Sequence, residues 1–333
     1  MNNTPHIAII GAGIAGLSCA TALQQAGIRI SVFDKSRGPA GRMSTRRADD
    51  WQCDHGAQYF TARHPDFRAE VARWQQAGVA GLWNPRLHVI DGVSLKQFGA
   101  PVERFVGIPR MTAPARLLAD ALPLQTQTTI KQLERHADGW HLFSAEHAWL
   151  DACFDAVILA MPAPQAAKLL QQAAPELATL AENVVMRGSW TLMLHFTAPV
   201  SLPFDAAFVN RGPLRWVARD SSKPGRDQPN HCETWVLQAT AAWSEAHLEG
   251  NPDTVAAELL EAFEKLGGAI PKTWTAHRWL YADSDPALDI AYAWQATMGV
   301  GLCGDWLNGG KVEGAWLSGN ALAKQVIESI KSD

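Results

Sequence analysis

A glycine-rich turn near the N-terminus has the residue types and spacing of a nucleotide-binding site. Gly11, Gly13 and Gly16 directly follow the apolar run 7–10, which is typical of a parallel strand buried on both faces. In this fingerprint the first glycine permits a tight turn, the second admits a diphosphate to the backbone, and the third lets the next helix pack closely. The helix N-terminus then offers free amides to the phosphates. The predicted contacts are Gly11, Ala12, Gly13, Ile14, Ala15 and Gly16.

An acidic residue stands at the end of the next predicted strand. The spacing predicts a helix over 15–25, a left-handed cap at Gly27 and a strand over 28–33. Asp34 follows, about 20 residues beyond the glycines, where a carboxylate can accept the hydroxyls of an adenosine ribose. Lys35, beside it, is a further candidate contact. The combination predicts a dinucleotide site; the alternative is that the glycines serve only a tight turn.

The segment 35–47 is a loop rich in arginine and glycine, where a simple NAD-binding domain would continue with strands and helices. Arg42, next to Gly41, is the candidate for a cofactor diphosphate, because a guanidinium can donate to two phosphate oxygens at once. An arginine for the 2′-phosphate of NADP is the competing use, and Asp34 in the ribose position argues against it. Solvation of an exposed loop would also explain some of these arginines.

A second group of small and polar residues lies in the segment 53–61. Gly56 and Ala57 let a planar ring approach the backbone, and Gln58 can both donate and accept hydrogen bonds. A single histidine such as His55 is more often a structural residue. The predicted cofactor contacts are His55, Gly56, Ala57, Gln58 and Tyr59.

The C-terminal region carries a second half-site. An apolar strand is predicted over 298–303, and a final helix over 315–330. Between them a carboxylate and free helix amides would point at one spot. A cofactor bound both here and at residues 11–42 must be long, so FAD fits better than NAD. The predicted contacts are Gly304, Asp305, Glu313, Gly314 and Ala315.

Between the half-sites the pattern predicts a second lobe. Helices are expected over 65–76, 112–122 and 251–266, a hairpin over 128–144, and a buried strand over 154–160. Short strands over 191–196, 207–210, 215–218, 234–239 and 276–281 are typical of an antiparallel sheet, and 220–227 is expected to be an exposed loop. The fold class is α/β: a Rossmann-like domain (1–64, 110–165 and 295–333) with an interleaved α+β substrate domain (65–109 and 166–294) containing a mixed or antiparallel sheet.

Composition excludes several classes of protein. The 333 residues carry a formal net charge of -4 with both signs interspersed, so no nucleic-acid or membrane partner is expected. Five cysteines without a CxxC pair argue against a disulfide framework and a metal site. Glycines and polar residues interrupt the apolar N-terminal segment, and no Lys or Arg precedes it, so neither a signal peptide nor an anchor is expected. We expect a cytoplasmic protein.

Tryptophan is unusually abundant, with 14 Trp against 3 Tyr, and most of it lies beyond Gly139. Core packing is the plain explanation; the alternative is that some of these rings line a pocket for a flat ligand. The sequence shows no Ser/His/Asp set and no carboxylate pair that would act as nucleophile, acid or base. No catalytic acid or base is therefore predicted.

Several motifs together resemble the flavin amine oxidase superfamily and, within it, the bacterial renalases. The superfamily resemblance lies in GxGxxG with its acid, the RGPAGR loop, the Gly-Asp near the C-terminus and the EGA helix start. The renalase resemblance lies in DHGAQYFTAR, MTAPARLLADAL, DSSKPGR, HRWLYA and GDW…VEGAWLSG, and covers most of the chain. Asp34 stands where many relatives have glutamate, and the shorter acid can still accept the ribose hydroxyls.

The resemblance implies a glutathione-reductase-type nucleotide fold, non-covalently bound FAD and a substrate lobe over the flavin. Renalases oxidise the 1,2- and 1,6-dihydro isomers of NAD(P)H to NAD(P)+, with molecular oxygen as acceptor and hydrogen peroxide as product. The resemblance also implies that Ile130 contacts the adenine through its backbone. A dihydropyridine expels hydride with the help of its own ring nitrogen, so the protein needs chiefly to orient it in a dry pocket.

The sequence is compatible with more than one set of substrate-pocket residues and with more than one substrate. Each candidate pocket residue could equally belong to the core or the surface. An amine oxidase or desaturase acting on a small amine is the alternative enzyme, and a flavin-binding protein without enzymatic activity is a third class. The candidates are Tyr59, Phe60, Trp216, Trp235 and Trp279 around the rings, with Arg187 for a substrate phosphate.

Overall fold

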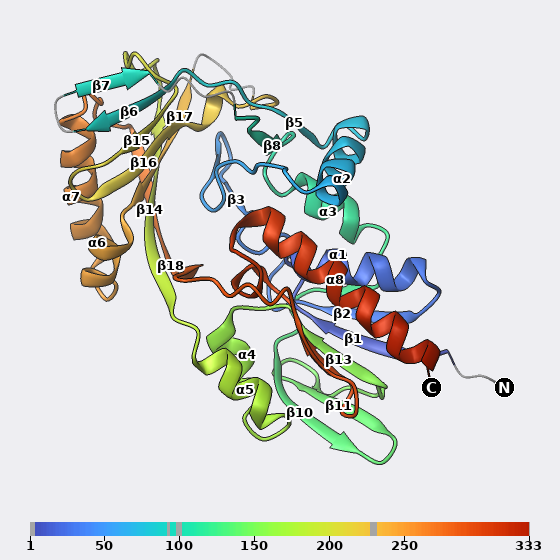
Figure 1. Ribbon diagram of the computed structural model, residues 1–333. Helices are drawn as coiled ribbons and strands as arrows, with labels where there is room; N and C mark the ends of the chain where they lie inside the picture. The colour runs from blue at the N-terminus through green and yellow to red at the C-terminus, as the bar shows by residue number, and fades with distance from the viewer. Residues whose placement is uncertain (1–3, 92–93, 98–101, 227–231, 333) are drawn as a thin grey trace.

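Two large sheets organise the molecule, and Figure 1 shows them in separate parts of the ribbon. The computed structural model describes residues 4–91, 94–97, 102–226 and 232–332. The six-stranded sheet has the order β19-β20-β13-β1-β2-β9. Its strands are β1 (His6–Ile10), β2 (Arg29–Phe33), β9 (Leu124–Gln125), β13 (Ala156–Leu159), β19 (Ala293–Gln295) and β20 (Val300–Leu302).

The predicted strand-helix-strand unit is confirmed. β1 is buried along its whole length and pairs in parallel with β2 on one side and β13 on the other. Helix α1 (Ile14–Gln25) connects β1 to β2, and Gly27, with φ +81°, follows its end. A Cβ on Gly16 would lie 2.0 Å from the carbonyl oxygen of Gly11, so only glycine lets the helix start this close to the turn.

The last helix packs across the first. α8 (Lys311–Ser332) crosses α1, and a Cβ on Gly319 would lie 2.0 Å from the carbonyl oxygen of Ala15. The prediction that this helix starts at Ala315 is wrong: it begins at Lys311. Gly309 and Gly310 both have left-handed φ values and turn the chain into the helix earlier. Glu313, Gly314 and Ala315 therefore lie within the first turns of α8.

The seven-stranded sheet forms the second lobe and is mixed. Only β15 and β6 pair in parallel, while the other neighbouring strands described in this sheet are antiparallel. Helices α6 (Ala241–Ala246) and α7 (Pro252–Glu264) cover one face, as Figure 1 shows, and the other face is turned toward α8 and α1. In sheet order the strands are β18 (Thr273–Ser284), β14 (Met186–Phe196), β17 (Glu233–Ala239), β16 (Leu214–Arg219), β15 (Ala206–Val209), β6 (Leu87–Asp91) and β7 (Ser94–Gln97).

Smaller elements join the two sheets. The predicted hairpin is present as β10 (Ile130–His136) and β11 (Gly139–Ser144), and β12 (Ala148–Trp149) adds a third strand. α2 (Pro65–Gln76) has the predicted limits, and α3 (Ala113–Ala119) is shorter than predicted. Two further helices, α4 (Ala163–Leu170) and α5 (Pro175–Glu182), were not predicted. The remaining pieces are β3 (Thr45–Arg47), β4 (Gln52–Asp54), β5 (Ala80–Leu82), β8 (Phe105–Gly107), η1 (Asp220–Ser222) and η3 (Asp305–Leu307).

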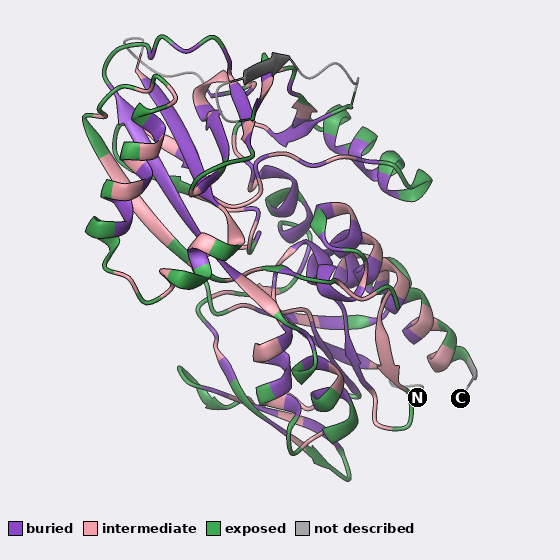
Figure 2. Cartoon of the chain, turned by 60° about the vertical axis from the view of Figure 1, so that its left-hand side comes forward, coloured by how far each residue is buried: buried purple, intermediate pink, exposed green. Residues whose placement is uncertain are grey.

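Burial follows this arrangement. Figure 2 shows strands of both sheets as largely buried, while the outward sides of the helices are exposed. Separate apolar cores lie beneath α1 and α8, beneath α4 and α5, and between the seven-stranded sheet and α7. None of the described helices combines the length and apolar composition needed to cross a membrane.

The expectation that 220–227 is an exposed loop is wrong for its charged residues within the described part, whereas Gly225 is exposed as expected; Asp227 lies outside the described residues. Asp220, Lys223 and Arg226 are buried together with Asp54 of β4, and all four side chains are 0% exposed. Lys223 Nζ lies 2.7 Å from Asp220 Oδ1 and 3.1 Å from Asp54 Oδ2, and Arg226 Nη2 lies 2.6 Å from Asp54 Oδ2. Two acids and two cations neutralise one another, which permits the burial. This buried ionic cluster fixes the loop that follows β4.

Candidate cofactor and substrate cavity

One large cavity lies between the two sheets. Its volume is about 1580 Å³, and its walls come from the glycine turn, the arginine-rich loop, the start of β10, the inner face of the seven-stranded sheet and the start of α8. Segments predicted to form two distant half-sites thus meet at one space. Of the predicted site residues, those that line it are Gly11, Gly13, Ile14, Ala15, Asp34, Lys35, Gly41, Arg42, Gly56, Ala57, Gln58, Tyr59, Phe60, Ile130, Trp216, Trp279, Gly304, Asp305, Glu313 and Ala315.

Asp34 is held rigidly at one end of the cavity. The backbone amide of Ala12 donates to Asp34 Oδ2 at 2.7 Å, and the amide of Ser36 donates to Oδ1 at 2.7 Å. Each carboxylate oxygen keeps a second lone pair for a ligand hydroxyl. Ile130 lines the same end of the cavity, together with Thr128 and Thr129. This geometry suits the recognition of a ribose.

The glycines of the turn divide into two roles. A Cβ on Gly13 would meet nothing within 4 Å, and Gly13 lines the cavity, so its backbone is open to a ligand. A Cβ on Gly11 would lie 2.3 Å from the carbonyl oxygen of Ala160. Ala12 and Gly16 are buried behind the turn and do not line the cavity, contrary to the prediction. They position the turn by packing and through the bond from Ala12 to Asp34.

Arg42 and Asp305 connect the two half-sites. Arg42 Nη1 donates to Asp305 Oδ2 at 2.9 Å, and Nη2 lies 2.5 Å from Oδ1. Nη1 also donates to the carbonyl oxygen of Ala282, in β18. The residue predicted for the diphosphate, Arg42, and the acid of the predicted C-terminal half-site, Asp305, thus form one bidentate pair that lines the cavity and ties the arginine-rich loop to η3.

Two more predicted cofactor contacts, His55 and Gly314, do not line the cavity. His55 is 7% exposed and does not line the cavity; its ring stacks on Trp279 at a centroid distance of 5.3 Å. The carbonyl oxygen of His55 accepts from Trp279 Nε1 at 3.0 Å. Gly314 lies against Asn308 and also stays outside the cavity. Glu313 Oε1 accepts from the amides of Arg63 and His64, so its carboxylate is engaged by the protein.

The inner face of the seven-stranded sheet carries a row of cross-strand neighbours, the substrate row. His277 pairs with Thr191, Thr191 with Gln238, and Gln238 with Trp216, while Ser189 pairs with Trp279 one step along. Cross-strand partners and alternate residues share a face, so these side chains lie on one surface. The hydroxyls of Ser189 and Thr191 are buried without a hydrogen-bond partner. Members that line the cavity are Ser189, Trp216, Gln238, His277 and Trp279.

Strand alternation also explains why Trp235 is not in the pocket. It lies three residues before Gln238 and so faces the opposite side, where it is 0% exposed and packs against Phe204 and Phe263. Arg187 does not line the cavity either: its guanidinium pairs with Glu245 at 2.9 Å and Asp285 at 3.5 Å on the surface. Both predictions are corrected by the structure.

The histidines near the substrate row are neutral at physiological pH. Burial lowers the pKa of His277 to about 4, with a smaller contribution from the charge of Arg46. Burial, together with the charges of His277 and Arg46, lowers the pKa of His55 to about 3. The aromatic and polar groups over this part of the cavity therefore carry no charge from histidine.

Several cavity residues were missed by sequence reasoning. Their signal was weak, because a single Gln or Ser on a strand reveals neither its face nor its depth. Arg63 is the last residue of the DHGAQYFTAR motif, and its place in that motif does not indicate a role for its side chain. The missed residues include Arg63, Arg104, Lys168, Ser189, Arg215, Gln238 and His277.

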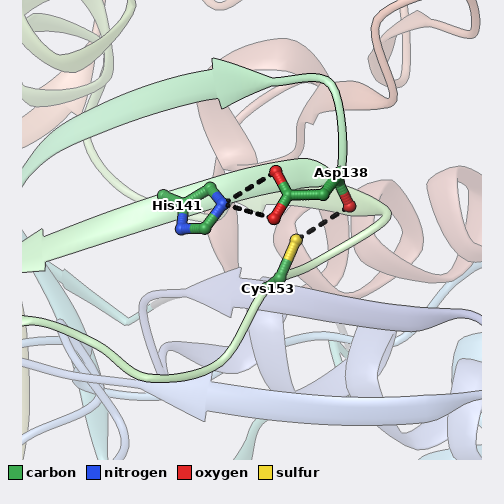
Figure 3. A group of neighbouring side chains, drawn as sticks. All are labelled: Asp138, His141 and Cys153. Atoms are coloured by element: carbon green, nitrogen blue, oxygen red, sulfur yellow. Dashed lines mark hydrogen bonds and ion pairs between the residues drawn. The ribbon is translucent and has the colours of Figure 1, made fainter.

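A separate group of potential metal ligands lies where the turn between β10 and β11 meets the segment between β12 and β13. Asp138, His141 and Cys153 have ligand atoms within 4.8 Å of one another (Figure 3). His141 Nε2 lies 3.0 Å from Asp138 Oδ1, and the Cys153 thiol donates to the carbonyl oxygen of Asp138. Burial raises the pKa of the Cys153 thiol, which keeps it protonated, and all five cysteines are free. No member of this group lines the cavity.

Two family models match the chain. The model described as an NAD(P)-binding Rossmann-like domain matches residues 9–74, and the model described as flavin containing amine oxidoreductase matches residues 74–327. Among curated proteins, 198 residues are 31% identical to the tRNA 5-methylaminomethyl-2-thiouridine biosynthesis bifunctional protein MnmC of Magnetococcus marinus, over 46% of this chain and 29% of that protein. The chain spans less than a third of the length of that curated relative.

Solved structures share the fold over nearly the whole chain. A candidate protoporphyrinogen oxidase from Exiguobacterium sp. 255-15 has a TM-score of 0.79 at 13% identity, covering 98% of this chain and 99% of that one. Cyclohexylamine oxidase from Brevibacterium oxydans has a TM-score of 0.74 at 12% identity, covering 99% and 100%. These likenesses show the fold, and the second family model covers more than half of the sequence. The chain therefore belongs to the family of flavin containing amine oxidoreductases, and its cofactor is FAD.

Proposed function

We propose that the protein oxidises dihydro isomers of NAD(P)H, the 1,2- and 1,6-dihydronicotinamides, to NAD(P)+. The substrate loses a hydride, two electrons with one proton, and its ring becomes an aromatic pyridinium. Oxygen takes up the two electrons together with one further proton from solvent and leaves as hydrogen peroxide. The observation that carries this proposal is the uncharged, aromatic character of the substrate row.

The substrate row supplies what a nicotinamide ring needs. Trp216 and Trp279 offer flat faces, and Ser189 and Gln238 offer hydrogen-bonding groups to a carboxamide. Gln238 Nε2 donates to the carbonyl oxygen of Gly56 at 2.8 Å, which fixes the orientation of the side chain. Because the ring nitrogen drives hydride release, the row needs no acid or base, and the low pKa values of the two histidines agree with that requirement.

The charge of the cavity suits anionic dinucleotides. Among the described residues that line it, nine are Lys or Arg and four are Asp or Glu. Each of the four acids already accepts a hydrogen bond from the protein: Asp34 from two amides, Asp283 from the amide of Ser284, Asp305 from Arg42, and Glu313 from two amides. The cavity therefore offers few unengaged carboxylates to a cationic amine. It offers an excess of positive charge to phosphates.

The residues present fit FAD. Asp34 is oriented to accept ribose hydroxyls, Gly13 leaves space for a diphosphate at the backbone, and the Arg42–Asp305 pair links the two predicted half-sites. When bound, FAD supplies the two-electron acceptor chemistry that this reaction requires. The protein's part is to hold the cofactor at both ends, to stack and orient the substrate ring, and to keep water from the contact.

Oxidation or desaturation of a small amine is the second candidate. The family model and the near-complete structural likeness to cyclohexylamine oxidase favour it. An amine must lose its proton before it can donate hydride, so this reaction would accelerate as pH rises through the pKa of the amine. The substrate row offers no charged base for that step, because burial keeps its histidine, His277, neutral and of low basicity, as it does His55 behind it.

Anaerobic mixing separates the two candidates. The purified holoenzyme is mixed with each dihydronicotinamide isomer and, separately, with cyclohexylamine and putrescine, and the visible absorbance of oxidised flavin is followed. We expect rapid bleaching by at least one dihydronicotinamide isomer and none by the amines. Bleaching by the amines alone would establish the second candidate, and bleaching by none would reject both.

A further inference from the structure

Arg104 is a buried cation without an anionic partner. It lines the cavity, is 8% exposed, and its Cζ lies 5.4 Å from the centroid of the Tyr59 ring. Nη1 donates to the carbonyl oxygen of Val102 at 3.1 Å, whereas Nε is buried with no hydrogen-bond partner. Within the described parts of the chain no carboxylate pairs with this guanidinium; the adjacent acid, Glu103, pairs with Arg68 at 2.9 Å.

Other buried cations in the same lobe differ from Arg104 because they pair with carboxylates. Lys223 and Arg226 pair with Asp54 and Asp220 in the buried ionic cluster, as expected for charges removed from water. The Tyr59 ring and one carbonyl oxygen compensate only part of the cost of burying the guanidinium of Arg104. A negatively charged group that enters the cavity would complete the compensation.

The position of Arg104 identifies which part of a ligand it would meet. The Tyr59 ring that it covers lies 5.6 Å from the ring of Trp216, a member of the substrate row. Arg63 and Arg215 line the same cavity on exposed positions, and neither forms an ion pair with a described residue. The Arg42–Asp305 pair and the glycine turn, by contrast, belong to the half-sites of the cofactor.

We propose that Arg104 binds the phosphate of the substrate nucleotide, within a cavity whose other lining cations include Arg63 and Arg215. The proposal rests on the proposed function, and it makes Arg104 a residue that determines specificity for phosphorylated substrates. A guanidinium matches phosphate because its planar fork donates to two oxygens at once. In a nicotinamide nucleotide, one ribose separates this phosphate from the reacting ring, so Arg104 acts on binding and not on hydride transfer.

The test compares two substrates that differ only in phosphate. Anaerobic bleaching of the holoenzyme is measured with a dihydronicotinamide mononucleotide and with the corresponding riboside, which lacks phosphate, to obtain the dissociation constant of each. We expect the wild type to bind the mononucleotide about 10- to 100-fold more tightly, the range for hydrogen bonds to a charged group. Arg104→Gln should reduce this preference to within a few-fold, and FAD content and thermal unfolding report whether the variant folds.

Arg211→Gln is the matched control. It removes the same charge from a side chain that is 76% exposed, contacts Asp91 at 3.8 Å and does not line the cavity. Should Arg104→Gln not fold, inorganic pyrophosphate provides the test in the wild type: it should compete with the mononucleotide and not with the riboside.

Three results would overturn the proposal: equal affinities in the wild type, a preference that survives Arg104→Gln, or equal competition by pyrophosphate against both substrates. Bleaching of the wild type by neither substrate would instead reject the proposed function itself. Bleaching by L-amino acids, weakened by Arg104→Gln, would show that the anion is a carboxylate and would overturn the assignment to phosphate.

Discussion

At the scale of single residues, the glycine turn contains one glycine that opens onto the cavity, Gly13, and one that packs against backbone, Gly16. The Cβ of an alanine at position 13 would enter the open cavity, whereas at position 16 it would lie 2.0 Å from a backbone oxygen. We therefore expect Gly13→Ala to fold and to lose most of its FAD, since the methyl group occupies the space proposed for the diphosphate. The FAD-to-protein ratio after purification measures this effect.

Gly16→Ala is the control for that substitution. The new methyl group must displace α1 from the turn, so we expect a lower melting temperature of the apoprotein, on the order of several degrees. The apoprotein of Gly13→Ala should melt close to the wild-type apoprotein. Similar melting temperatures for the two variants, or full FAD occupancy in Gly13→Ala, would contradict the division of roles.

At the scale of elements, the buried ionic cluster joins β4 to the segment after β16. Removing one cation leaves a buried carboxylate uncompensated, and burial then opposes its charge. We expect Lys223→Met to reduce the free energy of unfolding by about 3–5 kcal/mol. Burial opposes ionisation of Asp54, but Lys223 and Arg226 outweigh it and hold the pKa of that carboxyl below its ordinary value.

Arg68→Met tests an exposed pair of the same kind. The side chains of Arg68 and Glu103 are 52% and 49% exposed, so the substitution should reduce the free energy of unfolding by less than about 1 kcal/mol. Urea unfolding of both variants gives the comparison. Equal losses would show that the buried cluster contributes no more than a surface pair.

His55, in the loop after β4, is buried against Trp279 of β18, and this burial predicts a pH dependence of stability. His55 has a pKa of about 3 in the folded protein, against 6.5 as its ordinary value, so between these pH values only the unfolded chain binds the proton. Stability from this group is complete above pH 6.5 and falls as the pH drops; at pH 5 the loss is about 2 kcal/mol. In His55→Gln the difference in unfolding free energy between pH 8 and pH 5 should shrink by that amount, and an unchanged difference would contradict the burial argument.

At the scale of the whole molecule, the walls of the cavity come from both large sheets. FAD held by the glycine turn, the Arg42–Asp305 pair and α8 would bind only the folded chain. We expect removal of FAD to lower the melting temperature. Adding FAD at 100 times its Kd should raise the free energy of unfolding of the apoprotein by about 2.7 kcal/mol. FMN lacks the adenosine half that Asp34 is proposed to hold, so it should restore much less; equal rescue by FMN would argue against that end of the site.

Packing also refines the proposed division into domains. The predicted boundary at 165 and 166 falls inside α4, yet Leu170, Ala178 and Ala181 belong to the same buried cluster as Ile10 and Leu159. We propose that α4 and α5 belong to the FAD-binding part and that the substrate part resumes with β14. The other proposed boundaries remain those derived from the sequence, at 64, 109 and 294.

The sequence by itself determined the β1-α1-β2 unit and its terminal acid, and from them it predicted a dinucleotide site, because adjacent residues build these features and local periodicity reports them. It also predicted most strands of the second lobe. Only the tertiary structure decided which face each strand turns to the cavity: Trp216 and Gln238 face it, and Trp235 does not. It likewise placed Arg104 in the cavity wall and buried the charged segment after β16. The pairing of β15 with β6 and the compensation of the buried charges depend on residues more than 100 positions apart, and no local pattern encodes them.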